Sequence, residues 1–136
     1  MLYTLLKLIY KAGLWVFFKK LEVRNRHLIP GEGPLLVVSN HPNTFMDPIV
    51  TASLLEQPVF FIAKSTVFGG KFQNWMLRQM HLIPINRRED NPDQPISNEE
   101  AFAASFRALE QGKTILIFPE GNSFNQRRLR KIKTGT

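Results

Sequence analysis

A histidine and an aspartate six residues apart, His41 and Asp47, are the first pair of side chains in this sequence that could carry out chemistry. A neutral imidazole can take a proton from a hydroxyl group near pH 7. A carboxylate bonded to the other ring nitrogen fixes the tautomer and stabilises the imidazolium that forms. A loop can fold Asp47 back toward His41, so the pair is a candidate general base. The alternative is that Asp47 only caps a helix that opens at Asp47-Pro48, and that His41 is a solvated loop residue.

Two other groups are suited to bind a substrate. Arg87 carries a planar guanidinium that matches a phosphate, although a surface arginine beside the acidic pair Glu89-Asp90 looks the same in sequence. Glu120 precedes Gly121 in a Phe-Pro-Glu-Gly segment, where glycine permits a positive φ and a close approach of a ligand, or else simply makes a tight turn. The chain has no Gly-x-Ser-x-Gly segment and no cysteine, so neither a nucleophile elbow nor a catalytic thiol or thiolate metal site is supported.

Short apolar runs and helical patterns alternate along the chain, and they must position these groups. Strands are expected at Leu35–Ser39, Val59–Ala63, His81–Ile85 and Thr114–Phe118, with a weaker candidate at Leu21–Arg26. Helices are expected at Asp47–Glu56, at Lys71–Met80, and from Ser97, which has capping-box spacing to Glu100, up to Gly112. This alternation predicts an α/β domain with a mixed or largely parallel central sheet flanked by helices. Sites in such sheets gather beyond the carboxyl ends of strands, where the candidate residues stand.

Length and charge limit the possible classes of protein. The chain has 136 residues, of which 43% are hydrophobic and 21% are charged, which predicts one packed domain. The net charge of +7 divides into +5 for residues 1–26, −3 for residues 27–122 and +5 for residues 123–136. Basic ends around a slightly acidic body favour an anionic partner: nucleic acid, a membrane surface or a phosphorylated substrate. The basic tail lacks interleaved aromatic residues and a DNA-binding signature, which argues against nucleic acid.

Residues 1–20 predict an amphipathic helix that associates with a membrane interface. Lys7 and Lys11 interrupt the apolar run, so a membrane-spanning helix is not expected. The two lysines share one narrow helix face, and the apolar remainder is too wide for one partner. Trp15 and the pair Lys19-Lys20 suit the headgroup level of a bilayer. The alternative is a first helix that packs only on the domain's own core.

Three motifs, in this order, resemble those of the glycerolipid acyltransferases, the lysophosphatidic acid (1-acylglycerol-3-phosphate) O-acyltransferase family. They are Asn40-His41…Asp47, Ile83-Pro84-Ile85-Asn86-Arg87 and Phe118-Pro119-Glu120-Gly121. The resemblance begins at about Leu21 and continues to the last residue. It implies an acyltransferase α/β domain at residues 21–136, which would follow the interfacial helix expected at residues 1–20.

The resemblance implies a role for each matched residue. His41 would be the general base that deprotonates the acceptor hydroxyl, and Asp47 would orient it. The hydroxyl would then attack the thioester of acyl-CoA or acyl carrier protein without a covalent enzyme intermediate. No metal and no cofactor other than this co-substrate are implied. Residues implied to bind substrate are Arg87 for the acceptor phosphate, Glu120, Gly121 and Asn40 at the acceptor site, and Lys133 as extra positive charge.

The expected reaction is the esterification of a lysophospholipid, most simply lysophosphatidic acid to phosphatidic acid. The expected location is an anionic membrane surface at the cytoplasmic face of a bacterial inner membrane, with no nucleic-acid partner. Two alternatives remain open. The acceptor could be glycerol 3-phosphate or another lysolipid, or the domain could be a non-catalytic module that binds anionic lipid.

The chain departs from the family pattern at three places. Five residues, rather than four, separate His41 from Asp47, and Asn122-Ser123 replace the usual Thr-Arg. The chain also stops at Thr136, where the family continues with further elements. From that last difference we expect the sequence to be a fragment or a truncated reading frame.

Overall fold

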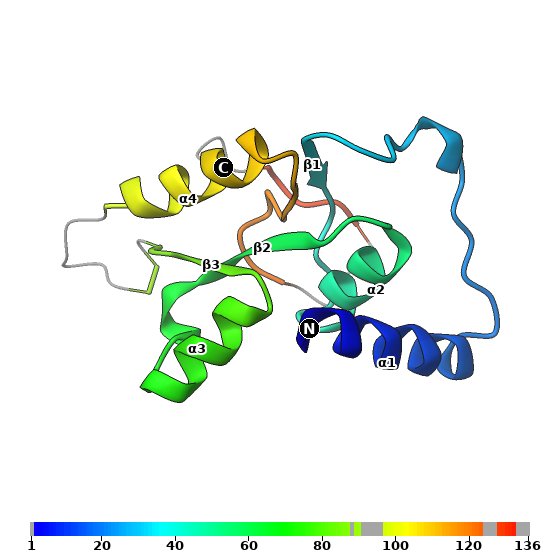
Figure 1. Cartoon of the computed structure of the whole chain (residues 1–136), viewed down its shortest axis with the longest axis horizontal. Coiled ribbons are helices and arrows are strands. Elements are labelled where there is room, and N and C mark those ends of the chain that lie inside the picture. The colour runs from blue at the N-terminus through cyan, green and yellow to red at the C-terminus, as the bar shows by residue number, and fades with distance from the viewer. Residues whose placement is uncertain (1, 88, 91–96, 124–127, 133–136) are drawn as a thin grey trace.

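A four-stranded parallel sheet forms the centre of the computed structural model, which describes residues 2–87, 89–90, 97–123 and 128–132 (Figure 1). Its strands are β1 (Leu35–Val38), β2 (Val59–Lys64), β3 (Leu82–Ile85) and β4 (Thr114–Ile117). They lie in the order β1-β4-β2-β3, and every neighbouring pair is parallel. The predicted α/β class with a largely parallel sheet is therefore confirmed.

Helices lie on both faces of this sheet. They are α1 (Leu2–Phe17), α2 (Met46–Leu54), α3 (Lys71–Gln79) and α4 (Glu99–Glu110), with two short 3-10 helices, η1 (Arg26–Leu28) and η2 (Ser65–Val67). The chain moves outward from β1 to β2 to β3 and then returns to β4. Since crossover connections are right-handed, the reversal places α4 on the face opposite α2 and α3. Figure 1 shows this arrangement, with α1 packed beside α2.

The core lies between α2 and the two inner strands. Ala52 and Leu55 from the α2 segment pack on Val59 of β2 and Leu116 of β4, and the last two side chains are fully buried. An inner parallel strand is covered on both faces, which explains why Thr114–Ile117 reads as a continuous apolar run. The buried strand β4 ends directly before Phe118–Gly121, so it holds the start of this segment in place.

The weaker strand candidate, Leu21–Arg26, is wrong. Glu22 in this segment pairs with Lys20 and Arg24 on the surface, and all three side chains are largely exposed. Asn25 adopts a left-handed conformation, with φ of 54°, and leads into η1. Only Leu21 and Val23 are apolar here, and the left-handed Asn25 ends any extended run, so the segment crosses the surface instead of joining the sheet.

Two helix starts also differ from the prediction. Asp47 is not the N-cap of α2, because Asn43 takes that capping role: its Oδ1 accepts the backbone N–H groups of Phe45 and Met46 at 3.2 and 3.1 Å. At α4 the N-cap residue is Asn98, and the expected capping box from Ser97 does not form. The amide of Asn98 bonds instead with the backbone of Asn86, which joins the start of α4 to the end of β3.

Helix α1 is fastened to the domain by two polar side chains. The ammonium of Lys7 donates to the carbonyl oxygens of Leu55, Glu56 and Gln57 at 2.6, 3.0 and 3.4 Å. These carbonyls belong to the C-cap residue of α2 and the two residues after it, beyond the helical hydrogen bonds. The hydroxyl of Tyr3 accepts the N–H of Val59 at 2.9 Å. Burial, with a smaller effect of Lys11, lowers the pKa of Lys7, and burial raises the pKa of Tyr3.

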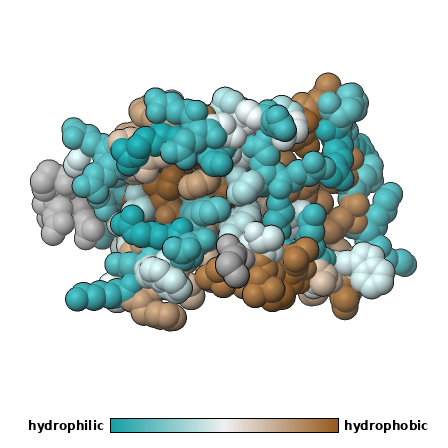
Figure 2. Space-filling view, viewed as in Figure 1, coloured by the Kyte–Doolittle hydropathy of each residue, from teal (hydrophilic) through white to brown (hydrophobic). Residues whose placement is uncertain are grey.

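The rest of α1 leaves a large apolar surface uncovered. Its exposed apolar residues are Leu5, Leu8, Ile9, Trp15, Val16 and Phe17. Figure 2 shows hydrophobic side chains gathered along the edge of the molecule where Figure 1 places α1. Within the described part of the chain, every helix falls short of the length and apolar character that crossing a bilayer would require.

Candidate active site

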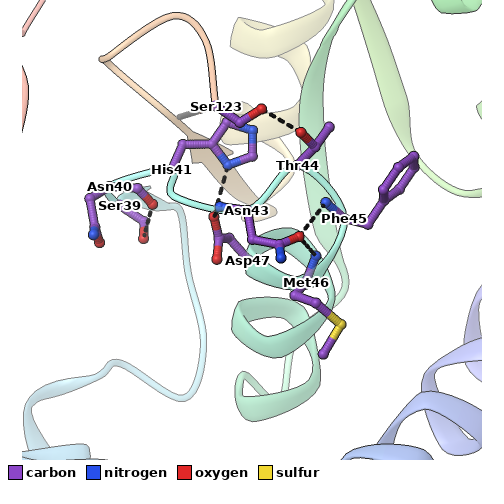
Figure 3. Close-up of polar contacts among 9 residues, drawn as sticks. All are labelled: Ser39, Asn40, His41, Asn43, Thr44, Phe45, Met46, Asp47 and Ser123. Atoms are coloured by element: carbon purple, nitrogen blue, oxygen red, sulfur yellow. Dashed lines mark hydrogen bonds and ion pairs between the residues drawn. The ribbon is translucent and has the colours of Figure 1, made fainter. Parts of the chain in front are cut away.

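The structure brings His41 and Asp47 into contact. Nδ1 of His41 lies 3.1 Å from Oδ2 of Asp47, and the side chains are only 13% and 19% exposed (Figure 3). The same carboxylate oxygen accepts the backbone N–H of Asn43 at 2.6 Å. An ionised carboxylate only accepts hydrogen bonds, so this contact places the imidazole proton on Nδ1 and leaves the lone pair of Nε2 free. In Figure 3 that second ring nitrogen lies on the side of Ser123.

Asn43 is the residue that makes this contact possible, and the sequence prediction missed it. Its side chain turns the chain into α2 by accepting two backbone N–H groups, and its own N–H holds Asp47. The loop therefore closes although five residues separate His41 from Asp47. An asparagine three residues before the first helical residue is a recognisable capping signal, so the sequence did contain a hint.

The aromatic ring of Phe118 supports the imidazole. The two rings are stacked, with centroids 3.9 Å apart and planes inclined by 16°. The contact joins the segments that follow β1 and β4, which are neighbours in the sheet, with Val38 opposite Ile117. The N–H of Ser39 continues the pairing by donating to the carbonyl oxygen of Ile117 at 3.1 Å. His41 thus stands on the edge of the most buried part of the sheet.

The Phe118–Gly121 segment makes a tight turn beyond β4. The N–H of Gly121 donates to the carbonyl oxygen of Phe118 at 3.0 Å, and Gly121 has a φ of 77°, which requires glycine or incurs strain. Glu120 in this turn is only 7% exposed. Among the described residues, none makes a hydrogen bond or an ion pair with its carboxylate. A buried carboxylate with spare acceptor capacity can receive hydrogen bonds from a ligand's hydroxyl groups.

Hydrogen bonds between side chains tie the three strand-end segments together. Nη1 of Arg87, which is half-buried after β3, donates to Oδ1 of Asn122 at 2.9 Å. On the other side of the same turn, the hydroxyls of Thr44 and Ser123 are hydrogen-bonded (Figure 3). The segments after β1, β3 and β4 therefore form one connected edge that contains His41, Arg87 and the Glu120 turn.

Two predicted substrate-binding residues do not join this cluster. Asn40 is exposed, and Figure 3 shows it on the other side of His41 from Thr44 and Ser123. Its only described polar contact is a hydrogen bond from Oγ of Ser39 to its carbonyl oxygen. Lys133 lies outside the described residues.

An open cleft of about 300 Å³ lies over the loop that directly follows His41. It is lined by Pro42, Asn43, Thr44, Phe45 and Ser123. Phe45 is 77% exposed there and gives the cleft an apolar wall. A smaller cavity of about 100 Å³ lies where strands β1 and β4 begin, between Leu35, Leu54 and Thr114, and it contains none of the predicted site residues. The cleft over the His41–Asp47 loop is therefore the better candidate place for a substrate.

The chain is similar to known acyltransferases. A family model described as Acyltransferase matches residues 20–136. A 1-acyl-sn-glycerol-3-phosphate acyltransferase of Borreliella burgdorferi is 28% identical over 98% of this chain and 51% of the relative. A Bacillus subtilis protein of the same name is 20% identical over 74% of this chain and 47% of the relative. An uncharacterized acyltransferase of Schizosaccharomyces pombe is 29% identical over 60% of this chain and 14% of the relative.

The chain spans about half the length of the two bacterial relatives. No solved structure matches it.

Proposed function

The chain belongs to the acyltransferase family, and we propose that it transfers a fatty acyl group from a thioester donor to the free hydroxyl of a lysophospholipid. The acceptor that fits best is lysophosphatidic acid, and the product is then phosphatidic acid. The names of the two bacterial relatives support this choice of acceptor. The observation that carries the proposal is the 3.1 Å contact between His41 and Asp47, in a loop whose intervening residues line an open cleft.

The proposed reaction needs one base and no covalent enzyme intermediate. Nε2 of His41 takes the proton of the acceptor hydroxyl as its oxygen attacks the carbonyl carbon of the thioester. The C–S bond breaks, an ester forms, and the leaving thiolate takes the proton back from the imidazolium. Asp47 stabilises that imidazolium through Nδ1. The co-substrate is acyl-CoA or acyl carrier protein, and the proposal includes no further cofactor.

The groups around His41 bind the acceptor in this proposal. We assign the phosphate to Arg87, because a guanidinium can donate two parallel hydrogen bonds to a phosphate. Glu120, with Gly121, accepts hydrogen bonds from hydroxyl groups of the acceptor. For Asn40, which is exposed on the other side of His41, and for Lys133, which lies outside the described residues, substrate binding stays a prediction from the resemblance.

The exposed side of α1 is proposed to lie on an anionic membrane surface. Its apolar residues are uncovered, and the exposed lysines Lys11, Lys19 and Lys20 accompany them. Apolar burial combined with attraction of each cation by about 1 kcal/mol favours such a surface. The cytoplasmic face of a bacterial inner membrane provides both the anionic lipid and the acyl donors.

Flotation with anionic vesicles tests the membrane proposal and should recover the protein. Replacing Trp15 and Phe17 with serine should reduce recovery; unchanged recovery would contradict this assignment.

Release of free CoA from acyl-CoA tests the enzymatic proposal. We expect release only when lysophosphatidic acid is added, together with equimolar phosphatidic acid detected by mass spectrometry. The same assay with glycerol 3-phosphate decides between the two acceptors. Release without acceptor would mean hydrolysis, and no release with either acceptor would contradict the proposal. The contact between His41 and Asp47 favours an enzyme over a module that only binds lipid.

A further inference from the structure

Asn122 lies between a cation and an anion at the edge of the site. Its Oδ1 accepts a hydrogen bond from Nη1 of Arg87 at 2.9 Å. Its Nδ2 donates to Oε2 of Glu89 at 2.6 Å. A carboxamide has an acceptor and a donor on one rigid group, and these two partners fix its orientation. The side chain therefore satisfies both charged groups at once.

The two charged groups would otherwise be natural partners for each other. Arg87 and Glu89 are two residues apart in the segment that follows β3. A carboxylate and a phosphate both bind a guanidinium through two parallel N–H groups, so they compete for the same donors. Among the described residues no direct ion pair joins Arg87 to Glu89; Asn122 contacts both instead.

We propose that Asn122 is a positioning residue that keeps Arg87 apart from Glu89 and so makes the site selective for an acceptor that carries a phosphate. This inference rests on the proposed function, because it assigns to Arg87 the phosphate of the acceptor. The bond to Asn122 uses one of the five guanidinium N–H donors and leaves the others for an anion. It also holds the guanidinium against the turn that contains Glu120, on the same edge as His41.

Steady-state kinetics of Asn122→Ala with two acceptors test this inference. The acceptors are lysophosphatidic acid and a monoacylglycerol with the same acyl chain, which lacks the phosphate. For lysophosphatidic acid we expect KM to rise about tenfold, with kcat within about twofold, because a factor of ten is what one charge-assisted hydrogen bond contributes. For the monoacylglycerol neither constant should change. An equal rise of KM for both acceptors would overturn the inference.

A second substitution separates positioning from a general structural role. In the Asn122→Ala background, Glu89→Gln removes the competing carboxylate, and KM for lysophosphatidic acid should return to within about threefold of its original value. Failure of this rescue would overturn the inference. Ser123→Ala is the matched control, because it loosens the same turn at Thr44 without touching Arg87. It should affect the two acceptors alike.

Two safeguards keep the test decisive. If Asn122→Ala lowers the midpoint of thermal unfolding by more than a few degrees, the near-isosteric Asn122→Asp takes its place. It should also raise KM for lysophosphatidic acid alone, since a carboxylate there pairs with Arg87.

If the unaltered protein acylates neither acceptor, the proposed function fails. Calorimetric titration with glycerol 3-phosphate then decides: weaker binding by Asn122→Ala supports the inference, and equal or absent binding overturns it.

Discussion

The imidazole ring of His41 stacks on the phenyl ring of Phe118, with centroids 3.9 Å apart, although 77 positions separate the two residues in sequence. Phe118 packs on a face of the imidazole, and Asp47 contacts its Nδ1 at 3.1 Å. These two contacts hold the ring in one orientation. This pre-organisation is what a general base requires, because proton transfer depends on geometry before it depends on acidity.

Replacing His41 with alanine should abolish acyl transfer. Loss of a general base typically costs between about 10² and 10⁴ in kcat. Free CoA released in the presence of lysophosphatidic acid measures the effect, and circular dichroism checks that the fold remains. His27→Ala is the matched control, because His27 is exposed in η1, away from the site. Turnover within threefold of the unaltered protein would remove His41 from the mechanism.

Replacing Asp47 with asparagine should lower kcat while leaving KM for the acceptor nearly unchanged. The amide keeps the size of the side chain, but it cannot stabilise an imidazolium as a carboxylate does, so we expect a loss of about a hundredfold or more. The backbone N–H of Asn43 keeps an acceptor in the amide oxygen. A variant whose main defect is a raised KM would show that Asp47 acts on binding instead.

Replacing Lys7 with alanine should detach α1 from the end of α2. The ammonium of Lys7 reaches three carbonyl oxygens there, and hydrogen bonds from charged groups contribute about 1.5–3 kcal/mol. We expect a lower midpoint in urea unfolding and faster amide exchange in α1. Lys11→Ala is the matched control, because Lys11 lies one turn further along α1 and is exposed. Equal midpoints for the two variants would contradict the assignment.

The stability of the fold should decrease in mild acid because of His81. Its ring stacks between Tyr3 and Phe60, at 4.6 and 4.5 Å, and its Nδ1 is buried without a hydrogen-bond partner among the described residues. Burial, followed by the charge of Lys113, lowers the pKa of His81 below its ordinary value of 6.5. Just below pH 6.5, His81 binds a proton more readily in the unfolded chain than in the folded chain. Stability is therefore complete above about pH 6.5 and falls as the pH drops below it.

Urea unfolding at about pH 7.5 and about pH 5.5 measures this effect. The midpoint should fall at the lower pH, and His81→Asn should show a smaller fall. Asparagine suits the position because His81 has a φ of 62°, which asparagine tolerates better than most residues. Identical pH dependence in the two proteins would assign the acid sensitivity to other groups.

The sequence by itself determined the four strands, a mixed or largely parallel sheet and the edge at which the candidate residues lie. Each strand is a short apolar run bounded by Gly, Pro or polar residues, and these local signals report burial directly. The positions of His41, Arg87 and Glu120 followed, because parallel strands deliver their carboxyl ends to one edge. The segment Leu21–Arg26 misled the prediction, since its apolar residues alternate with charges that pair on the surface.

Only the tertiary structure decided which of these residues touch. Strand order places β4 beside β1, and that order alone stacks Phe118 on His41 and joins Ser123 to Thr44. It also places Asn122 against Arg87. Local patterns encode burial and turn preference, whereas a contact between distant loops depends on how the whole sheet assembles. Asn43 and Asp47 were both able to cap α2. In the folded loop Asn43 does so, and Asp47 contacts His41 instead.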